Sequence, residues 1–384
     1  MKIAAIQAIP LYIPIRVDIA GADKDTAMSV CLVRVDTECG RTGWGFTAIT
    51  EEEVIAEIVN RVAAPNLVGE EVMARELIWH KLYWLLSPRG QTGYASHAIA
   101  AIDVAIWDLI GQKLEQPVWK LLGGSRDKVP LYATFGFPFF DRDQLAAAAL
   151  HWIADGFTHL KMTVGDGALR KAASGYSIDD AIARDIERVR AVREAVGPDV
   201  RLYLDANCNL DLFHATKLAR AVEEYDIAMF EEPVTQNDVP SMADLRQKTS
   251  IPLGCGQNEG LSFRFRDLLA AGAVDVVQPN VVISGGYTQC VKIAGMAEAH
   301  NVRFANGGAW SYHNMHIHAG LANGGLVEHH YLAVECYKAV YRGLPEPENG
   351  FLPLPQGPGL GFSPDEDAVR ELSKRPTSAG AGKT

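Results

Sequence analysis

Three oxygen-bearing side chains recur at a constant spacing in the second half of the chain. Asp205, Glu231 and Gln257 are 26 residues apart from one to the next, which is about the length of one strand-plus-helix unit. If each residue ends a neighbouring parallel strand, the three side chains converge on one point. Mg²⁺ prefers carboxylate and carbonyl oxygens. The spacing therefore predicts a Mg²⁺ site, whereas any single acid at a helix start can instead be a partner of the helix dipole.

Other polar residues also end short apolar runs, where a β/α barrel builds its active site. Lys161 (HLKMTVG) and Glu328 (LVEHH) are candidate catalytic groups. The candidate substrate-binding residues, found in HLKMTVG, LYLDANCN, VVQPN and RFANGG, are Thr163, Asn207, Asn280 and Asn306.

The elements that must position these residues follow a regular rhythm after Val129, in which short apolar strands alternate with amphipathic helices. Eight strand cores are predicted, at 131–134, 159–163, 201–204, 228–230, 252–255, 274–277, 302–305 and 326–327. This alternation is typical of a β/α barrel. A doubly wound sheet would be expected to carry a GxGxxG turn after an early strand, and the sequence has none there.

The first part of the chain has a different pattern. Two strand-like segments precede helical stretches, which indicates an α+β lobe. We expect this lobe at 1–125, the barrel at 126–340, and a Pro- and Gly-rich segment at 341–384 that returns to the first lobe. The polar stretch 18–25 is predicted to be a mobile lid over the site. Residues 381–384 (AGKT) resemble the end of a phosphate-binding loop but lack its upstream glycine, so we expect a disordered terminus.

Composition narrows the class of protein. The chain has 384 residues, a net charge of −11, 48% apolar and 22% charged residues. This charge disfavours nucleic acid as a partner, and no apolar run reaches the ~18 residues of a membrane span. Six scattered cysteines and the absence of a signal-peptide pattern favour a reducing, cytoplasmic location.

Several motifs together resemble one family. Residues 101–108 (AIDVAIWD) with the following GQKLEQPVWKLLGG, and then Lys161, LDAN, FEEP and QPN with GG, are similar to the mandelate racemase and muconate-lactonizing branch of the enolase superfamily. The resemblance covers nearly the whole chain. It implies a (β/α)7β barrel, similar to a TIM barrel, with an N-terminal α+β capping domain. It also implies Mg²⁺ at the ends of the third, fourth and fifth strands, a small-molecule carboxylate substrate, removal of its α-proton to give an enediolate, and a homo-oligomer.

The sequence departs from that family at the proton-transfer positions. Relatives commonly have Lys-x-Lys on the second strand, but here Thr163 takes the place of the second Lys. The third metal ligand is usually an acid, and here the alternatives are Gln257 and Glu259. The His–Asp pair of the racemases is missing, since Asn280 is at one position and no histidine is near Asn306.

Histidines reappear a few residues later, in WSYHNMHIH. His313 is the nearest to a strand end and is our candidate acid or base. The alternative is a helix face of histidines that serve only structure. Asp103 and Asp108, on an apolar helix, are expected to bond to backbone because buried acids need partners.

These departures favour one reaction. Racemisation needs acid/base groups on both faces of the enediolate, whereas dehydration needs one base and one acid. The sequence therefore predicts a Mg²⁺-dependent lyase that dehydrates a sugar acid or hydroxy acid. The alternatives are a racemase, epimerase or cycloisomerase of the same family, or a relative that binds carboxylates without catalysis.

Overall fold

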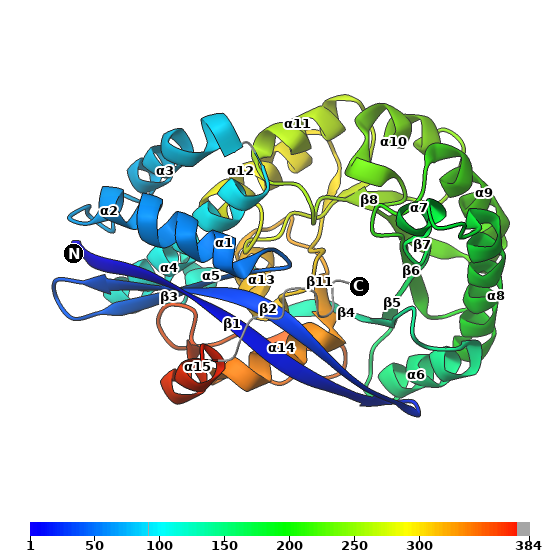
Figure 1. The fold of residues 1–384 in the computed structure, drawn as a ribbon, viewed down its shortest axis with the longest axis horizontal. Coiled ribbons are helices and arrows are strands. Elements are labelled where there is room, and N and C mark those ends of the chain that lie inside the picture. The colour runs from blue at the N-terminus through cyan, green and yellow to red at the C-terminus, as the bar shows by residue number, and fades with distance from the viewer. Residues whose placement is uncertain (91, 375–384) are drawn as a thin grey trace.

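The computed structural model describes residues 1–90 and 92–374. The predicted disordered terminus at 381–384 lies outside these residues. Figure 1 shows two lobes, a capping lobe built from the first part of the chain and a barrel built from the middle. Within the described residues, no helix is both long and apolar enough to cross a membrane.

The capping lobe joins an antiparallel sheet of order β1-β2-β3 to a group of helices. Its elements are β1 (Ile3–Ile19), β2 (Ala22–Thr37), β3 (Thr42–Ala48), α1 (Glu52–Glu57), the π-helical segment η1 (Ile58–Ala63), α2 (Ala64–Leu67), α3 (Arg75–Gly90), α4 (Tyr94–Leu114) and α5 (Val118–Leu121). The apolar helix α4 lies directly on β3, where Gly43 and Gly45 leave room for its backbone.

The prediction of a loop at 18–25 is wrong, because β1 and β2 pair in register up to Ile19 and Ala22; the role of this segment as a lid stays a prediction. Ala20 and Gly21 form the turn, and both have positive φ (54° and 77°), as in the two-residue turns of β-hairpins. The charged side chains point to solvent while Ile15 and Val17 are buried. The hairpin extends as an arm toward the barrel (Figure 1), where the Lys24 ammonium lies 4.9 Å from the centre of the Phe139 ring.

The barrel contains the eight predicted strands, all parallel, in the order β10-β9-β8-β7-β6-β5-β4-β11. They are β4 (Lys128–Gly136), β5 (His159–Thr163), β6 (Arg201–Asp205), β7 (Ile227–Glu231), β8 (Leu253–Cys255), β9 (Val276–Val277), β10 (Arg303–Phe304) and β11 (Val327–His330). Asn306 joins the two ends of the sheet, since its backbone N donates to Leu326 O at 2.9 Å and its Oδ1 accepts from Glu328 N at 3.0 Å. The prediction of a (β/α)7β barrel with an α+β capping domain is confirmed.

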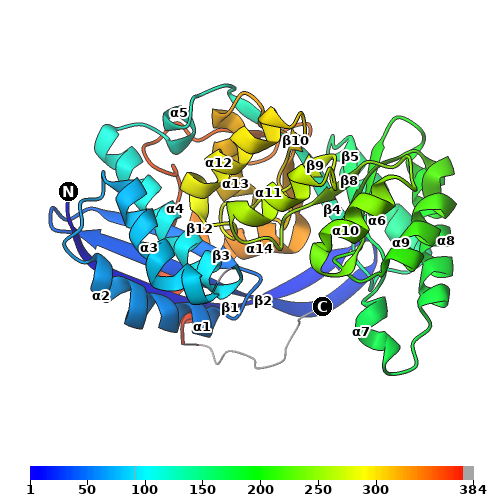
Figure 2. The same cartoon turned by 90° about the horizontal axis from the view of Figure 1, so that it is seen from above.

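Helices wrap the outside of the barrel, as Figure 2 shows for α6 to α10. They are α6 (Arg142–Ala154), α7 (Ala168–Ala172), α8 (Ile178–Val196), α9 (Leu212–Val222), η2 (Glu223–Tyr225), η3 (Thr235–Asn237), α10 (Val239–Arg246), α11 (Ser262–Ala270), α12 (Gly286–Ala299), α13 (Ser311–Gly320) and α14 (Tyr331–Val340). The chain continues through β12 (Tyr341–Arg342), β13 (Phe351–Pro353), β14 (Ser363–Pro364) and α15 (Glu366–Leu372).

Two buried acids of α4 tie these parts together, as predicted from the sequence. Asp103 accepts a hydrogen bond from Thr288 N at the start of α12, at 3.0 Å. Asp108 accepts from Trp44 N in β3 at 3.0 Å and from Leu360 N in the C-terminal segment at 2.9 Å. Because these backbone donors lie on separate elements, α4 fixes the capping sheet, the barrel and the C-terminal segment relative to one another.

The contact of α4 with β3 leads to a stability prediction. A Cβ at Gly45 would lie 1.7 Å from Ala101 O, so Gly45→Ala should lower the free energy of unfolding by more than about 3 kcal/mol. In the matched control, Gly295→Ala in α12, the new Cβ meets nothing within 4 Å, so this helix position should gain about 0.5–1 kcal/mol. Urea unfolding of both variants measures the difference, and equal midpoints would contradict the packing described here.

Candidate active site at the carboxyl ends of the barrel strands

Four of the predicted site residues meet at one point inside the barrel. The Lys161 ammonium lies 3.1 Å from Asp205 Oδ2, 2.8 Å from Glu231 Oε2 and 3.0 Å from Glu328 Oε1. All four side chains are at least 95% buried. We call these residues the lysine–carboxylate cluster.

Strand register brings the cluster together. Asp205 pairs with Glu231 across β6 and β7, and Lys161 pairs with Thr134 across β5 and β4. Side chains on the same face of these neighbouring strand ends therefore all point into the barrel. Glu328 is held from two more sides, by Thr134 Oγ1 at 2.5 Å and by Ala309 N at 2.7 Å.

The charges in the cluster do not balance. Burial alone would lower the pKa of Lys161, but Asp205, Glu231 and Glu328 together raise it well above its usual value, so the amine stays protonated. A protonated amine cannot accept a proton, so this arrangement does not favour Lys161 as the base that removes the α-proton. Burial likewise raises the pKa of Asp205 and of Glu231, against the opposing effect of Lys161. When all three carboxylates are ionised, one ammonium leaves an excess of negative charge; the raised pKa values reflect this crowding, and a further cation would relieve it.

Unpartnered polar atoms mark where that cation or another polar group fits. Glu231 Oε1 is buried and accepts no hydrogen bond within the described chain, and both amide atoms of the buried Gln278 are likewise without partners. Glu231 Oε1 and Gln278 Nε2 both lie 3.0 Å from the point where Gly307 would carry a Cβ. Buried polar groups seldom remain unsatisfied, so this glycine leaves space beside atoms that require a ligand.

The two alternatives for the third metal ligand have different surroundings. Glu259 uses Oε1 to accept from Asn237 Nδ2 at 3.1 Å and Oε2 to accept from Arg264 Nε at 2.7 Å. Gln257 donates its Nε2 to Glu232 Oε2 at 2.8 Å, and this leaves its amide oxygen as an available ligand. Asp205, Glu231 and Gln257 therefore suit Mg²⁺ better than a set with Glu259. No group of three or more His, Cys, Asp or Glu residues that could hold a metal ion is found in the described part of the chain.

The four predicted substrate-binding residues differ in what they can offer a ligand. Asn207 is exposed at the end of β6. Thr163 Oγ1 donates to Gly136 O at 2.8 Å. Asn280 and Asn306 are fully buried and are used by the fold: Asn280 Nδ2 donates to Gly307 O at 2.8 Å and to Gly308 O at 2.9 Å. The structure therefore gives these two asparagines a role in shaping the loop after β10.

His313 is not joined to the lysine–carboxylate cluster. Its Nδ1 lies 2.6 Å from Tyr337 Oη, and its ring stacks on Phe46 with centroids 5.2 Å apart. Burial holds its pKa well below the usual value. Its contacts are those of the alternative interpretation, a histidine packed for structure, and they give no support to a role as acid or base.

A different histidine lies close enough to the lysine–carboxylate cluster to interact electrostatically with Glu328 and Lys161. His330 ends β11, two residues after Glu328 and therefore on the same face of the strand. Burial lowers the pKa of His330 to about 4. The charge of Lys161 also lowers it, whereas the charge of Glu328 raises it. Its Nδ1 is buried without a hydrogen-bond partner among the described residues. The two-residue spacing of E-H-H on a strand was the signal in the sequence that indicated it.

Comparison with known proteins identifies the family. Residues 4–123 match the N-terminal domain of mandelate racemase and muconate lactonizing enzymes, and residues 144–368 match the enolase C-terminal domain-like family. The chain belongs to the mandelate racemase and muconate-lactonizing branch of the enolase superfamily.

Members of this branch with several named activities are similar to the chain. A D-galactonate dehydratase of Ralstonia nicotianae is 33% identical, covering 89% of this chain and 90% of that protein. A 3,6-anhydro-alpha-L-galactonate cycloisomerase of Streptomyces coelicolor is 30% identical with the same two coverages. The crystal structure of a Streptomyces coelicolor racemase with bound magnesium is 27% identical, with a TM-score of 0.86 over 96% of this chain and 99% of that chain.

The cluster leads to a second stability prediction. Lys161→Met would leave three buried carboxylates without their ammonium, so the free energy of unfolding should fall by about 3–5 kcal/mol at pH 8. The control, Lys338→Met, removes an exposed pair with Glu335 at 3.0 Å and should cost less than about 1 kcal/mol. Urea unfolding measures both variants, and a similar small effect of each would show that Lys161 does not hold the acids together.

Proposed function

We propose that this protein is a Mg²⁺-dependent lyase that dehydrates a sugar acid or a related hydroxy acid. The observation that carries the proposal is the buried excess of negative charge at Asp205 and Glu231, beside the unpartnered Glu231 Oε1 and the free amide oxygen of Gln257. Membership of the branch and its dehydratase relatives support the same reaction.

Each residue of the site has a distinct role in this proposal. A Mg²⁺ ion held by Asp205, Glu231 and Gln257 would supply positive charge where the substrate carboxylate gains negative charge. The Lys161 ammonium, kept protonated by its three carboxylates, holds the ligands Asp205 and Glu231 in place and adds a buried positive charge beside the metal site. Glu328 positions that ammonium and does not itself transfer a proton, because its oxygens are used by Lys161, Thr134 and Ala309 N.

Proton transfer falls to His330. Its neutral imidazole takes the proton from the α-carbon as the Cα–H bond breaks. The resulting imidazolium returns that proton to the β-hydroxyl, so that the Cβ–O bond breaks and water leaves. The enol then rearranges to a 2-keto acid. One residue is thus base and then acid, which fits a site in which Thr163 bonds to Gly136 O and stands where relatives have a second Lys.

The sugar-acid class is best tested with a library of such acids in D₂O, observed by NMR. We expect loss of the α-proton signal and formation of a 2-keto acid for at least one member, only with Mg²⁺. A cyclised product in place of a keto acid would favour the cycloisomerase alternative. Absence of both exchange and product, with binding retained, would favour a carboxylate-binding protein without catalysis.

The assignment of the third metal ligand leads to a further prediction. Gln257→Ala should weaken Mg²⁺ binding about tenfold or more, because it removes one oxygen ligand. Glu259→Gln should change the Mg²⁺ dissociation constant little, because Asn237 and Arg264 already engage both Glu259 oxygens. Isothermal titration calorimetry measures both, and the reverse order of effects would assign Glu259 as the ligand.

The role of His330 is tested against its neighbour on the opposite face of β11. His330→Gln should lower kcat by about 10²-fold or more, with little change in KM. His329→Phe is the control, because His329 packs on Trp152 and Phe157, with centroids 5.7 and 5.5 Å away. Because a base must be neutral and the pKa of His330 lies near 4, kcat/KM should stay high as the pH falls past the usual histidine value of about 6.5. An acid limb at that value, or equal losses in both variants, would contradict the assignment.

A further inference from the structure

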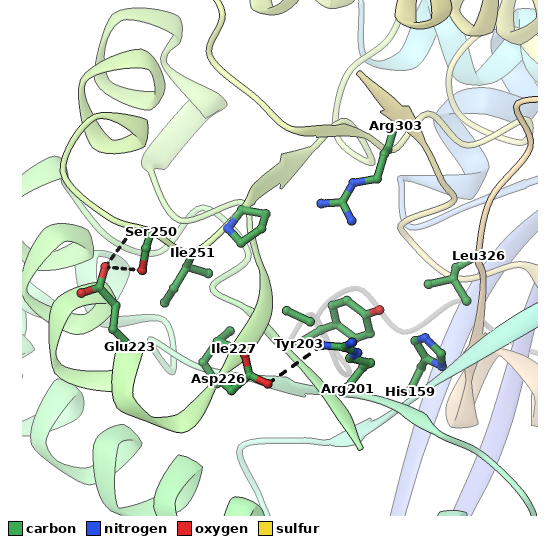
Figure 3. Close-up of a pocket in the computed structure, with 12 residues that line it drawn as sticks. His159, Arg201, Tyr203, Glu223, Asp226, Ile227, Ser250, Ile251, Arg303 and Leu326 are labelled. Atoms are coloured by element: carbon green, nitrogen blue, oxygen red, sulfur yellow. Dashed lines mark hydrogen bonds and ion pairs between the residues drawn. The ribbon is translucent and has the colours of Figure 1, made fainter. Parts of the chain in front are cut away.

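A hollow of about 540 Å³ opens at the amino-terminal end of the barrel, where the strands begin. The candidate active site lies at the other end, where the strands finish. Figure 3 shows the side chains that line the hollow. They come from the starts of β5, β6, β7 and β10 and from the segments just before β8 and β11. Its volume is that of a typical small-molecule site.

Tyr203 presents an unused hydrogen-bond donor to this hollow. The residue is only 8% exposed, yet its hydroxyl has no hydrogen-bond partner among the described residues. Burial raises its pKa to about 12, so the hydroxyl keeps its proton. The ring stacks on His159 with centroids 6.0 Å apart, which fixes it in place. Because Tyr203 lines the hollow, its hydroxyl can donate to a ligand there or to solvent.

Arg303 brings an unpaired positive charge to the same hollow. The nearby Asp275 does not pair with it, because Arg246 holds Asp275 Oδ1 at 3.0 and 2.7 Å and Leu253 N donates to its Oδ2 at 3.0 Å. No ion pair of Arg303 is found among the described residues. Figure 3 shows its guanidinium directed into the hollow.

Arg201 supplies a second guanidinium, from β6. Its only ion pair within the described chain is a loose one, with Nη1 3.9 Å from Asp226 Oδ2, and both side chains are more than half exposed. The other acid of the lining, Glu223, is occupied, since its Oε1 accepts from Thr249 Oγ1 at 2.8 Å and Ser250 N at 2.7 Å. The lining therefore holds two guanidiniums and two carboxylates: Glu223 is engaged through Oε1, Arg201 and Asp226 form a loose pair, and Arg303 has no ion pair among the described residues.

We propose that this hollow binds a small organic dicarboxylate. One carboxylate pairs with Arg303 and the other with Arg201, displacing the loose contact with Asp226, while the Tyr203 hydroxyl donates to the ligand. Guanidinium forks suit carboxylates because two parallel N–H donors face two oxygens. The two arginines start strands that are separated in the sheet by β7, β8 and β9, so a ligand with a charge at each end matches them better than a single-headed anion.

This site is separate from the proposed reaction. The rings of Tyr203 and Tyr132, with centroids 5.7 Å apart, lie in the barrel interior between the hollow and the lysine–carboxylate cluster. The Lys161 ammonium lies 5.3 Å from the centre of the Tyr132 ring. Binding at the hollow can therefore be measured without a known substrate, and its failure would leave the proposed lyase unaffected.

The test is calorimetry on the full chain in buffer with Mg²⁺, using succinate, glutarate and adipate, with propionate and glycerol 3-phosphate as single-headed anions. We expect one dicarboxylate length to bind best and the single-headed anions to bind at least about tenfold more weakly. Arg303→Ala should weaken the best dicarboxylate about tenfold or more, and Tyr203→Phe roughly threefold to tenfold.

The matched control is Arg266→Ala, an exposed arginine paired with its neighbour Asp267 at 2.8 Å, which should leave binding unchanged. Thermal unfolding of each variant verifies that the fold is intact. Three results would each overturn the proposal: no dicarboxylate binding, binding that persists in both Arg303→Ala and Tyr203→Phe, or glycerol 3-phosphate binding as tightly as the best dicarboxylate.

Discussion

The buried ammonium of Lys161 among three carboxylates is the interaction around which the barrel interior is organised. An isolated buried charge is very unfavourable, and carboxylates placed close together repel one another. Two of the acids are therefore supported from another side: Glu328 by Thr134 Oγ1 and Ala309 N, and Asp205 by Asn207 N at 2.9 Å. Glu231 keeps one oxygen without a partner. The negative charge that one ammonium leaves uncompensated is the physical basis for a cation site here.

The loop after β10 shows how the same chemistry shapes the backbone. Asn280 Nδ2 donates to the carbonyl groups of Gly307 and Gly308, and Asn306 joins the ends of the barrel sheet. The resemblance to racemases led us to expect acid and base groups in this region. Here both asparagines are used to hold the loop, and the glycine at 307 keeps space beside Glu231 and Gln278. In the proposed reaction, proton transfer therefore falls to His330 on β11.

The two ends of the barrel differ in the charged side chains that they present. The carboxyl ends of the strands gather acids, which favour a metal ion, whereas the amino ends present Arg201 and Arg303 around a hollow. Tyr132 and Tyr203 lie between, with their rings in contact. One closed sheet can hold both charge patterns because each strand contributes its first residues to one end and its last residues to the other.

Much of this protein was determined by the sequence itself. The eight strand cores, the α+β capping lobe, the backbone bonds of Asp103 and Asp108, and the convergence of Lys161, Asp205, Glu231 and Glu328 follow from local hydrophobic patterns and from the rule that parallel strands end on one face. Spacing along the chain is enough for such features, because the pattern within each strand determines where the strand ends and which of its residues face inward. The family followed from the same motifs.

Other features depended on the tertiary structure, because they are set by contacts between segments far apart in the sequence. The sequence at 18–25 resembles a polar loop, and only the structure shows it as the end of a hairpin whose apolar face packs on the rest of the protein. From the sequence His313 was a candidate base, but in the structure it packs against Phe46 and Tyr337. His330 became a candidate only when the structure placed it on the same face of β11 as Glu328. Gln257 and Glu259 are equivalent by spacing, and only the side chains of Arg264, Asn237 and Glu232 determine which oxygen remains free.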